Sequence, residues 1–234
     1  GHPPDVAAEL AQNAALVVCD RGFLRHQREW RTRLATLAHV PLIQVETDVV
    51  VPVETTSDKR EYAARTIRPK IRKHLPEFLD VPSPTKPAHS SLDLSVRGIA
   101  LTDSVGDILN RLSPGNTAQP VAYFEPGPAA AKNVLQAFIR NKLPRYSKNR
   151  NQPQTDDVSH MSKYLHFGQI SPVYVVKTVL DTADIQHEER ETFIEELVVR
   201  RELAHNFTHF TANYDTFECL PEWAQTTLLD HAAD

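Results

Sequence analysis

Continuous apolar runs mark the first part of the chain. Residues 15–19 are a short continuous apolar run of the kind found in buried parallel strands, residues 40–45 predict a second strand, and the segment 26–37 between them predicts a helix. A further run, 49–53, predicts an extended continuation. One strand–helix–strand crossover is too little to form a stable sheet alone. The pattern therefore predicts an incomplete parallel sheet, completed by strands ahead of residue 1 or by self-association of the chain.

Helical spacing replaces these runs after residue 57. Ser57 is a good N-cap, and Pro69 is expected to kink or restart the helix that follows. The apolar stripe of this helix consists of Ile67, Ile71, Leu75 and Phe78. Residues 81–128 hold many prolines and few apolar stripes, which predicts an interdomain linker with one short helix near 103–112.

From residue 129 onward the pattern predicts helices. Short helices at 164–167 and 172–180 are expected to be broken near Gly168. A longer helix carries an apolar stripe of Phe193, Leu197, Ala204 and Phe207. The second half of the chain is therefore expected to be all-helical.

Composition narrows the class of protein. The 234 residues carry a formal net charge of −4 and two cysteines, Cys19 and Cys219, with no CxxC pair. A disulfide framework and a cysteine zinc site are therefore not expected, and a reducing, intracellular compartment fits best. No apolar run approaches the ~18 residues of a membrane helix, so no membrane partner is expected.

Positive charge is concentrated in two places. Residues 59–73 hold seven Lys or Arg and one acid, and residues 142–150 hold four bases and no acid. Local basic faces on an acidic protein suit a phosphate-bearing partner. Charge alone is equally compatible with solvated helix faces.

Common catalytic motifs are absent. No G-x-G-x-x-G, P-loop or G-x-S-x-G motif occurs. His205 and His209 are four positions apart with Glu202 nearby, a spacing that could hold a metal ion, but no third ligand is evident. A histidine pair at the surface or the edge of the core is the better interpretation, and no metal site is expected.

The segment 159–171 carries the most chemical information. Ser159 and Ser162 are three positions apart, directly before a predicted helix. Free backbone N–H groups at a helix start favour an anion, and serine hydroxyls add neutral donors, so a diphosphate is a reasonable ligand. A serine N-cap without any ligand remains the alternative.

This segment resembles a known signature. Ser-His-Met-Ser-Lys-Tyr-Leu-His-Phe-Gly (159–168) is similar to the flavin-binding signature of the photolyase and cryptochrome family, usually Ser-x-Leu-Ser-Pro-x-Leu-x-x-Gly. Met161 stands for the usual leucine and Lys163 for the usual proline. The first change is mild, and the second could alter the helix start or add a phosphate contact.

Other segments resemble the class II branch of this family, which acts on cyclobutane pyrimidine dimers. They occur in the expected order along nearly the whole chain. They are KREYAARTIRPK (59–70), EELVVRRELAHNF (195–207), NYD (213–215) and LPEWA (220–224). Four ordered segments are a more specific signal than one.

The resemblance implies a fold and a cofactor. Residues 1–80 would form part of an α/β domain with an incomplete Rossmann-like parallel sheet, 81–128 the interdomain linker, and 129–234 the first part of an all-α domain that binds FAD. The chain would be mostly helical overall. Members of the family are about twice as long, so the chain would be an internal fragment without the N-terminal strands and the C-terminal half.

The resemblance also implies individual roles. Tyr146, Ser159, Met161, Ser162 and Leu165 match positions that hold the flavin, with the tyrosine and serines near the phosphates and ribityl chain.

Glu196 matches the glutamate that hydrogen-bonds the pyrimidine dimer and stabilises its radical anion. Such a carboxyl would need a raised pKa in a dry pocket to donate a proton to a carbonyl. Arg150, Asn151, Arg200, Arg201 and Asn206 are expected to contact the substrate DNA or the flavin. An ordinary intrahelical ion pair between Glu196 and Arg200 remains the alternative.

The implied activity is that of a carbon–carbon lyase, in which light drives an electron from reduced FAD into the dimer. The expected partner is damaged double-stranded DNA, and the expected location is the cytoplasm, with the nucleoid, or the nucleus. Two other classes stay open for the chain on its own: a non-enzymatic flavin- or nucleotide-binding relative, and a cofactor-free DNA-binding fragment.

Overall fold

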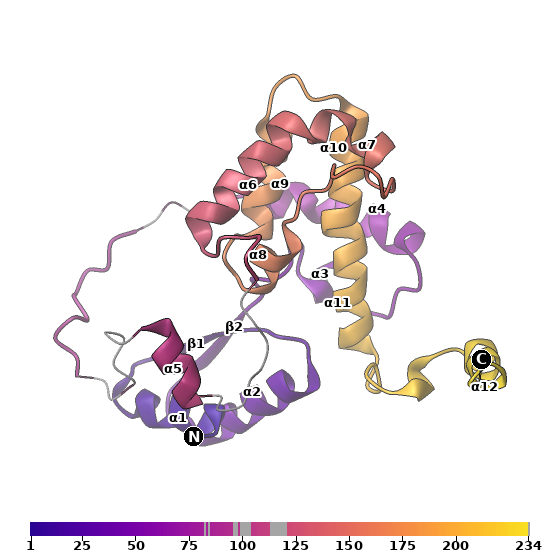
Figure 1. Cartoon of the computed structure of the whole chain (residues 1–234). Helices are drawn as coiled ribbons and strands as arrows, with labels where there is room; N and C mark the ends of the chain where they lie inside the picture. Colours follow the sequence, from indigo (N-terminus) through magenta and orange to yellow (C-terminus); the bar gives the residue numbers. More distant parts are fainter. Residues whose placement is uncertain (82, 84, 96–97, 99–103, 113–120, 234) are drawn as a thin grey trace. The chain divides into compact units, whose positions relative to one another are not determined.

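The computed structural model describes residues 1–81, 83, 85–95, 98, 104–112 and 121–233. They form two compact units, Gly1–Val81 with Pro126–Asp234 and, separately, Pro82–Glu125. The larger unit contains α1 (Pro3–Leu10), β1 (Val17–Asp20), α2 (Arg25–Leu37), β2 (Leu42–Val45), α3 (Val53–Thr56), α4 (Ala64–His74), α6 (Pro128–Asn141), α7 (Tyr146–Asn149), α8 (Ser162–His166), α9 (Pro172–Asp181), α10 (His187–Ile194), α11 (Arg201–Phe210) and α12 (Glu222–Asp230) (Figure 1).

Short helical segments of other types join these elements. A π-helix, Glu195–Arg200, connects α10 to α11 and makes them one continuous rod (Figure 1). The 3₁₀ segments are Ala11–Asn13, Leu75–Phe78, Leu143–Arg145 and Phe217–Cys219.

The strands β1 and β2 form a parallel pair, with Val17 opposite Leu42. One face of the pair carries Val18, Ile43 and Val45, which are 58%, 48% and 43% exposed. The strand–helix–strand prediction is confirmed, and so is the prediction of a mostly helical chain with an incomplete parallel sheet.

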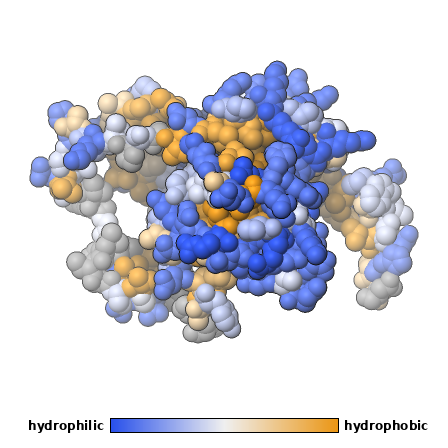
Figure 2. Space-filling view, turned by 90° about the horizontal axis from the view of Figure 1, so that it is seen from above, coloured by the Kyte–Doolittle hydropathy of each residue, from blue (hydrophilic) through white to orange (hydrophobic). Residues whose placement is uncertain are grey.

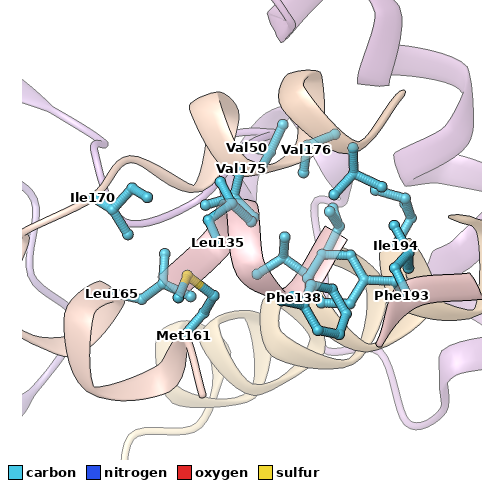
Figure 3. Close-up of a cluster of buried hydrophobic side chains, with 14 of the residues drawn as sticks. Val50, Leu135, Phe138, Met161, Leu165, Ile170, Val175, Val176, Phe193 and Ile194 are labelled. Atoms are coloured by element: carbon cyan, nitrogen blue, oxygen red, sulfur yellow. The ribbon is translucent and has the colours of Figure 1, made fainter. Parts of the chain in front are cut away.

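A hydrophobic core holds the helices of the larger unit together. Leu135 and Phe138 from α6 meet Val175 and Val176 from α9 and Phe193 near the end of α10 (Figure 3). Met161 and Leu165, beside and within α8, belong to the same cluster. The loop and helix that carry the flavin-like signature are therefore anchored by buried apolar side chains.

The segment after the sheet differs from its prediction in three ways. Residues 49–52 lie outside the sheet, and α3 begins at Val53. Ser57 ends α3 instead of starting the next helix, because its hydroxyl donates to Glu61 Oε1 at 2.8 Å and accepts from Lys70 Nζ at 2.9 Å. Pro69 does not restart the helix, since it lies inside α4, which continues to His74 with Ile67 and Ile71 buried; a kink at Pro69 stays a prediction. Apolar packing of these side chains therefore outweighs the hydrogen bond that proline cannot donate.

The predicted break after α8 is confirmed. Gly168 has a φ of 63°, in the left-handed region that glycine adopts without strain. Gln169 N–H then donates to the Tyr164 carbonyl at 2.8 Å, which closes the helix end.

In the smaller unit, α5 (Val105–Leu112) confirms the short helix predicted there, except for residue 103, which lies outside the described residues. The predicted domain boundaries stay a prediction. None of the helices in the described part of the chain is both long and apolar enough to cross a membrane.

Candidate functional site

A pocket of about 470 Å³ opens between the signature segment and the rod formed by α10, the π-helix and α11. Its volume lies within the range of small-molecule sites. The residues that line it all belong to the larger unit: Asp48, Tyr146, Ser159, Met161, Ser162, Leu165, His166, Phe193, Glu196, Leu197, Arg201 and His205.

The signature turn is held by hydrogen bonds at both ends. His160 has a φ of 54°, and its Nε2 lies 2.7 Å from Asp156 Oδ1. Lys163 Nζ donates to the His160 carbonyl at 2.8 Å. Lys163, which replaces the usual proline, thus fastens the turn that presents Ser159 and Ser162 to the pocket. The helix α8 has only five residues, so these hydroxyls matter more than a helix dipole.

Tyr146 closes one wall of the pocket with its aromatic ring. The ring meets Phe138 and Phe193 edge to face, at centroid distances of 5.6 and 5.5 Å. Burial raises the pKa of the Tyr146 hydroxyl, which is held neutral as a hydrogen-bonding group at physiological pH.

Glu196 lies between two guanidinium groups. Its Oε1 is 2.9 Å from Arg150 Nη1 and 3.3 Å from Arg200 Nε. This Glu196–Arg200 ion pair is the one that the sequence analysis gave as the alternative to a dimer-binding role for Glu196. Because the Glu196 side chain is also 30% exposed, its surroundings here are neither dry nor free of charge.

The π-helix decides which side chains share the pocket. In an α-helix two positions that are five residues apart point about 140° away from each other. The i→i+5 hydrogen bonds of a π-helix bring such positions nearly into line. Glu196 and Arg201 are five residues apart across this segment, and both line the pocket.

Arg201 is a partly buried cation that makes no direct ion pair with any acid in the described part of the chain. Burial lowers the pKa of its guanidinium, and Asp48 and Glu202 oppose that shift through space. Its Nη1 is buried and has no hydrogen-bond partner among the described residues. A group of this kind is expensive to bury unless a ligand satisfies it.

Four of the five predicted DNA or flavin contacts lie outside the pocket lining. Asn151 is exposed, and Arg200, whose side chain is 57% exposed, reaches the site through Glu196. Asn206 is 1% exposed and bonded to the backbone of residues 59 and 61. Arg150 also touches the site through Glu196.

Five lining residues were not among the sequence-predicted site residues: Asp48, His166, Phe193, Leu197 and His205. Phe193 and Leu197 were expected only as an apolar stripe. His205 lies four positions after Arg201, a spacing that places it on the same face. No local signal could have found Asp48, since it is far away in the sequence.

His205 is held as a neutral ring. Its Nδ1 lies 2.9 Å from the Arg201 carbonyl, and burial lowers the pKa of the imidazole. Among the described residues, no group of three or more His, Cys, Asp or Glu side chains could hold a metal ion.

Much of the positive charge in the two basic runs is balanced within the protein. Ion pairs join Arg68 to Glu195, Lys70 to Glu61, Arg72 to Glu191, Lys142 to Asp156, Arg145 to Asp157 and Arg150 to Glu196. Hydrophilic residues cover most of the face in Figure 2, with apolar surface near its centre. Within the two basic runs, the exposed bases that have no such partner among the described residues are Lys59, Arg65, Lys73 and Lys148.

Comparison with known proteins places this site in context. A family model described as DNA photolyase matches residues 1–88. The deoxyribodipyrimidine photo-lyase of Methanothermobacter thermautotrophicus is 43% identical over 233 residues, covering 99% of this chain and 50% of that protein. That of Potorous tridactylus is 34% identical and covers 100% of this chain and 44% of that protein. The chain spans about half the length of the curated relatives it matches.

Solved structures share the fold. A bacterial class III photolyase from Agrobacterium tumefaciens matches 90% of this chain and 44% of its own, with a TM-score of 0.61 and 18% identity. A cryptochrome from Synechocystis sp. PCC6803 matches 91% of this chain and 46% of its own, with a TM-score of 0.66 and 16% identity. The fold is therefore the one that photolyases and cryptochromes share. With the sequence matches to the photo-lyases, the chain belongs to the DNA photolyase family.

Proposed function

We propose that this chain is part of a class II photolyase that repairs cyclobutane pyrimidine dimers in double-stranded DNA by light-driven electron transfer from reduced FAD. The observation that carries the proposal is the pocket, whose lining combines Ser159 and Ser162 with the carboxylates of Asp48 and Glu196 and the partly buried guanidinium of Arg201. The shared name of the relatives and the class II-like segments support the same activity.

The chemistry of the lining residues fits a flavin dinucleotide. An anionic ligand would satisfy the buried Nη1 of Arg201, and hydroxyls from Tyr146, Ser159 and Ser162 would bind oxygens of the diphosphate and ribityl chain. Met161 and Leu165 would pack against the cofactor while remaining anchored in the core. Reduced flavin, when bound, supplies the electron that splits the dimer.

Glu196 would act on the lesion itself. Its carboxyl could stabilise the pyrimidine carbonyl on which negative charge develops. In the structure Arg150 and Arg200 hold this carboxyl. Contact of these two arginines with DNA phosphates would release Glu196 from its ion pairs and let it face the flipped base.

The remaining contacts with DNA would come from unpaired surface bases. Lys59, Arg65, Lys73 and Lys148 are exposed and would grip phosphates without reading sequence, with Asn151 as a neutral donor. Binding should therefore weaken as salt is added. The nucleoid or nucleus is the compartment that such a partner requires.

Retention of FAD is the first expected result. The full gene product that carries this chain is expected to keep a flavin absorption band after incubation with FAD and desalting. Under near-ultraviolet or blue light and with a reductant, it should then restore a dimer-containing duplex to intact DNA, and it should not do so in the dark. The loss of the dimer can be measured by resistance of the duplex to a dimer-specific nicking enzyme.

The same experiment separates the competing functions. Flavin retention without light-dependent repair would favour a non-enzymatic relative. Salt-dependent DNA binding without flavin and without preference for the dimer would favour a cofactor-free DNA-binding protein. Either result would contradict the photolyase proposal.

Self-association of the 234-residue chain is a further part of the proposal. The uncovered face of the sheet, with Val18, Ile43 and Val45, would be buried if two copies met there. We expect the chain to sediment as a dimer at micromolar concentration and Ile43→Lys to shift it to the monomer. The control Val121→Lys replaces an exposed valine of the smaller unit, and an equal shift in both variants would contradict docking through the sheet.

A further inference from the structure

The helix α11 presents two neighbouring faces with different partners. Arg201 and His205, one turn apart, line the pocket. Glu202 and Asn206, the next position in each case, are 2% and 1% exposed and point away from solvent toward residues 50–61. Two buried polar side chains one turn apart indicate that this face of α11 is held by hydrogen bonds and not by apolar packing alone.

Glu202 binds the backbone just after the sheet. Its Oε1 accepts the Val50 N–H at 2.6 Å and the Val51 N–H at 3.3 Å. Both of these residues are buried in the core, at 3% and 0% exposure. Asp48, two positions before Val50, lines the pocket. The carboxyl of Glu202 therefore holds the stretch of backbone that carries Asp48.

Asn206 binds the same segment farther along. Its Oδ1 accepts the Glu61 N–H at 2.7 Å, and its Nδ2 donates to the Lys59 carbonyl at 3.0 Å. Both the oxygen and the nitrogen of the side-chain amide therefore form hydrogen bonds within the protein. The side chain has no exposed surface with which to meet DNA.

Together these bonds fix α11 about its own axis. They grip the helix at two points about 6 Å apart along its length, one turn from each other. A helix held in this way cannot rotate without breaking hydrogen bonds of buried groups, which is costly. Arg201 and His205 on the neighbouring face keep defined places, and Asp48 remains close enough to Arg201 to attract it.

We propose that Glu202 and Asn206 are positioning residues of the pocket: they clamp α11 to residues 50–61 and so set the places of Arg201, His205 and Asp48. Neither side chain then touches the ligand or the DNA. The proposal rests on the proposed function only where FAD serves as the probe.

The test uses four variants of the full gene product. Asn206→Ala and Glu202→Met break the clamp, and Glu202→Gln keeps an oxygen acceptor for the Val50 N–H. The control Thr208→Ala removes only a hydrogen bond within the same helix, from Thr208 Oγ1 to the Ala204 carbonyl. FAD affinity is measured by fluorescence titration at a temperature where circular dichroism shows every variant folded. We expect about a ten- to hundredfold loss for Asn206→Ala and Glu202→Met, the range found for residues that support the ligands of metal sites. Glu202→Gln and Thr208→Ala should stay near wild type.

A second measurement does not depend on the cofactor. The ring resonances of His205 in ligand-free protein should shift in Asn206→Ala and Glu202→Met but not in Thr208→Ala. If wild type binds no FAD, the proposed function fails, and the His205 resonances alone decide on the clamp. Unchanged resonances, or an FAD affinity in the clamp variants equal to that of Thr208→Ala, would overturn the positioning role.

Discussion

The free energy of unfolding of the wild-type protein is expected to fall by roughly 4 kcal/mol between about pH 5 and pH 8 because of Glu202, and Glu202→Gln is expected to remove this fall. Burial raises the pKa of Glu202 from 4.5 to about 8, although hydrogen bonds from the Val50 and Val51 N–H groups oppose the shift. Over this range the folded state keeps a proton that the unfolded chain has lost. The stability due to the protonated carboxyl is therefore complete below about pH 4.5 and is lost as the pH rises through 8.

The measurement is urea unfolding of wild type and Glu202→Gln at a series of pH values. Taking the difference between the two proteins cancels the titration of other groups. Glu61→Gln provides a contrast: burial raises the pKa of Glu61, but hydrogen bonds led by Lys70 outweigh it and lower the pKa to about 2. Glu61 is then ionised in both states above pH 5, so its difference should be flat. An equally flat difference for Glu202 would mean that its carboxyl is ionised in the folded protein.

Replacing Arg201 by methionine is expected to have opposite effects on binding and on stability. FAD affinity should fall about ten- to hundredfold, because a hydrogen bond to a charged group contributes about 1.5–3 kcal/mol. The free energy of unfolding should rise by about 1–2 kcal/mol, because the buried Nη1 without a partner is removed. Methionine keeps most of the apolar stem that packs in the pocket wall.

Arg140→Met is the matched control for this variant. Arg140 is exposed in the last turn of α6, away from the pocket lining, and its replacement should change neither quantity by much. Flavin fluorescence and urea unfolding give the two numbers. If Arg201→Met lost stability and kept its affinity for FAD, Arg201 would be a structural residue and not a ligand contact.

The local elements of this protein follow from local sequence. Short apolar runs predicted β1 and β2, and glycine after α8 predicted the end of that helix, because strand burial and left-handed backbone both depend on neighbouring residue types. Ser57 and Pro69 show the limit of such rules. Ser57 bonds to Lys70 and Glu61, and α4 continues through Pro69 because Ile67 and Ile71 pack in the core.

In the candidate site, too, the sequence predicted some residues and the tertiary structure decided the arrangement of others. Seven of the sequence-predicted site residues line one pocket: Tyr146, Ser159, Met161, Ser162, Leu165, Glu196 and Arg201. An α-helical count placed Glu196 and Arg200 on one face, and the Glu196–Arg200 ion pair agrees with it. The same count could not place Arg201 beside Glu196, because the π-helix arises from packing along the whole rod and has no local sequence signal.

The sequence by itself determined the family, the first strand–helix–strand unit and the helical character of the second half of the chain. These features depend on side chains close together in the chain, whose spacing can be read directly. Only the tertiary structure decided that Asp48 lines the pocket and that the Asn206 side chain hydrogen-bonds to the backbone of residues 59 and 61. It also decided that six bases of the two basic runs form ion pairs with acids of the same chain. Such contacts join residues distant in sequence, and burial then fixes which polar groups pair with each other and which remain for a ligand.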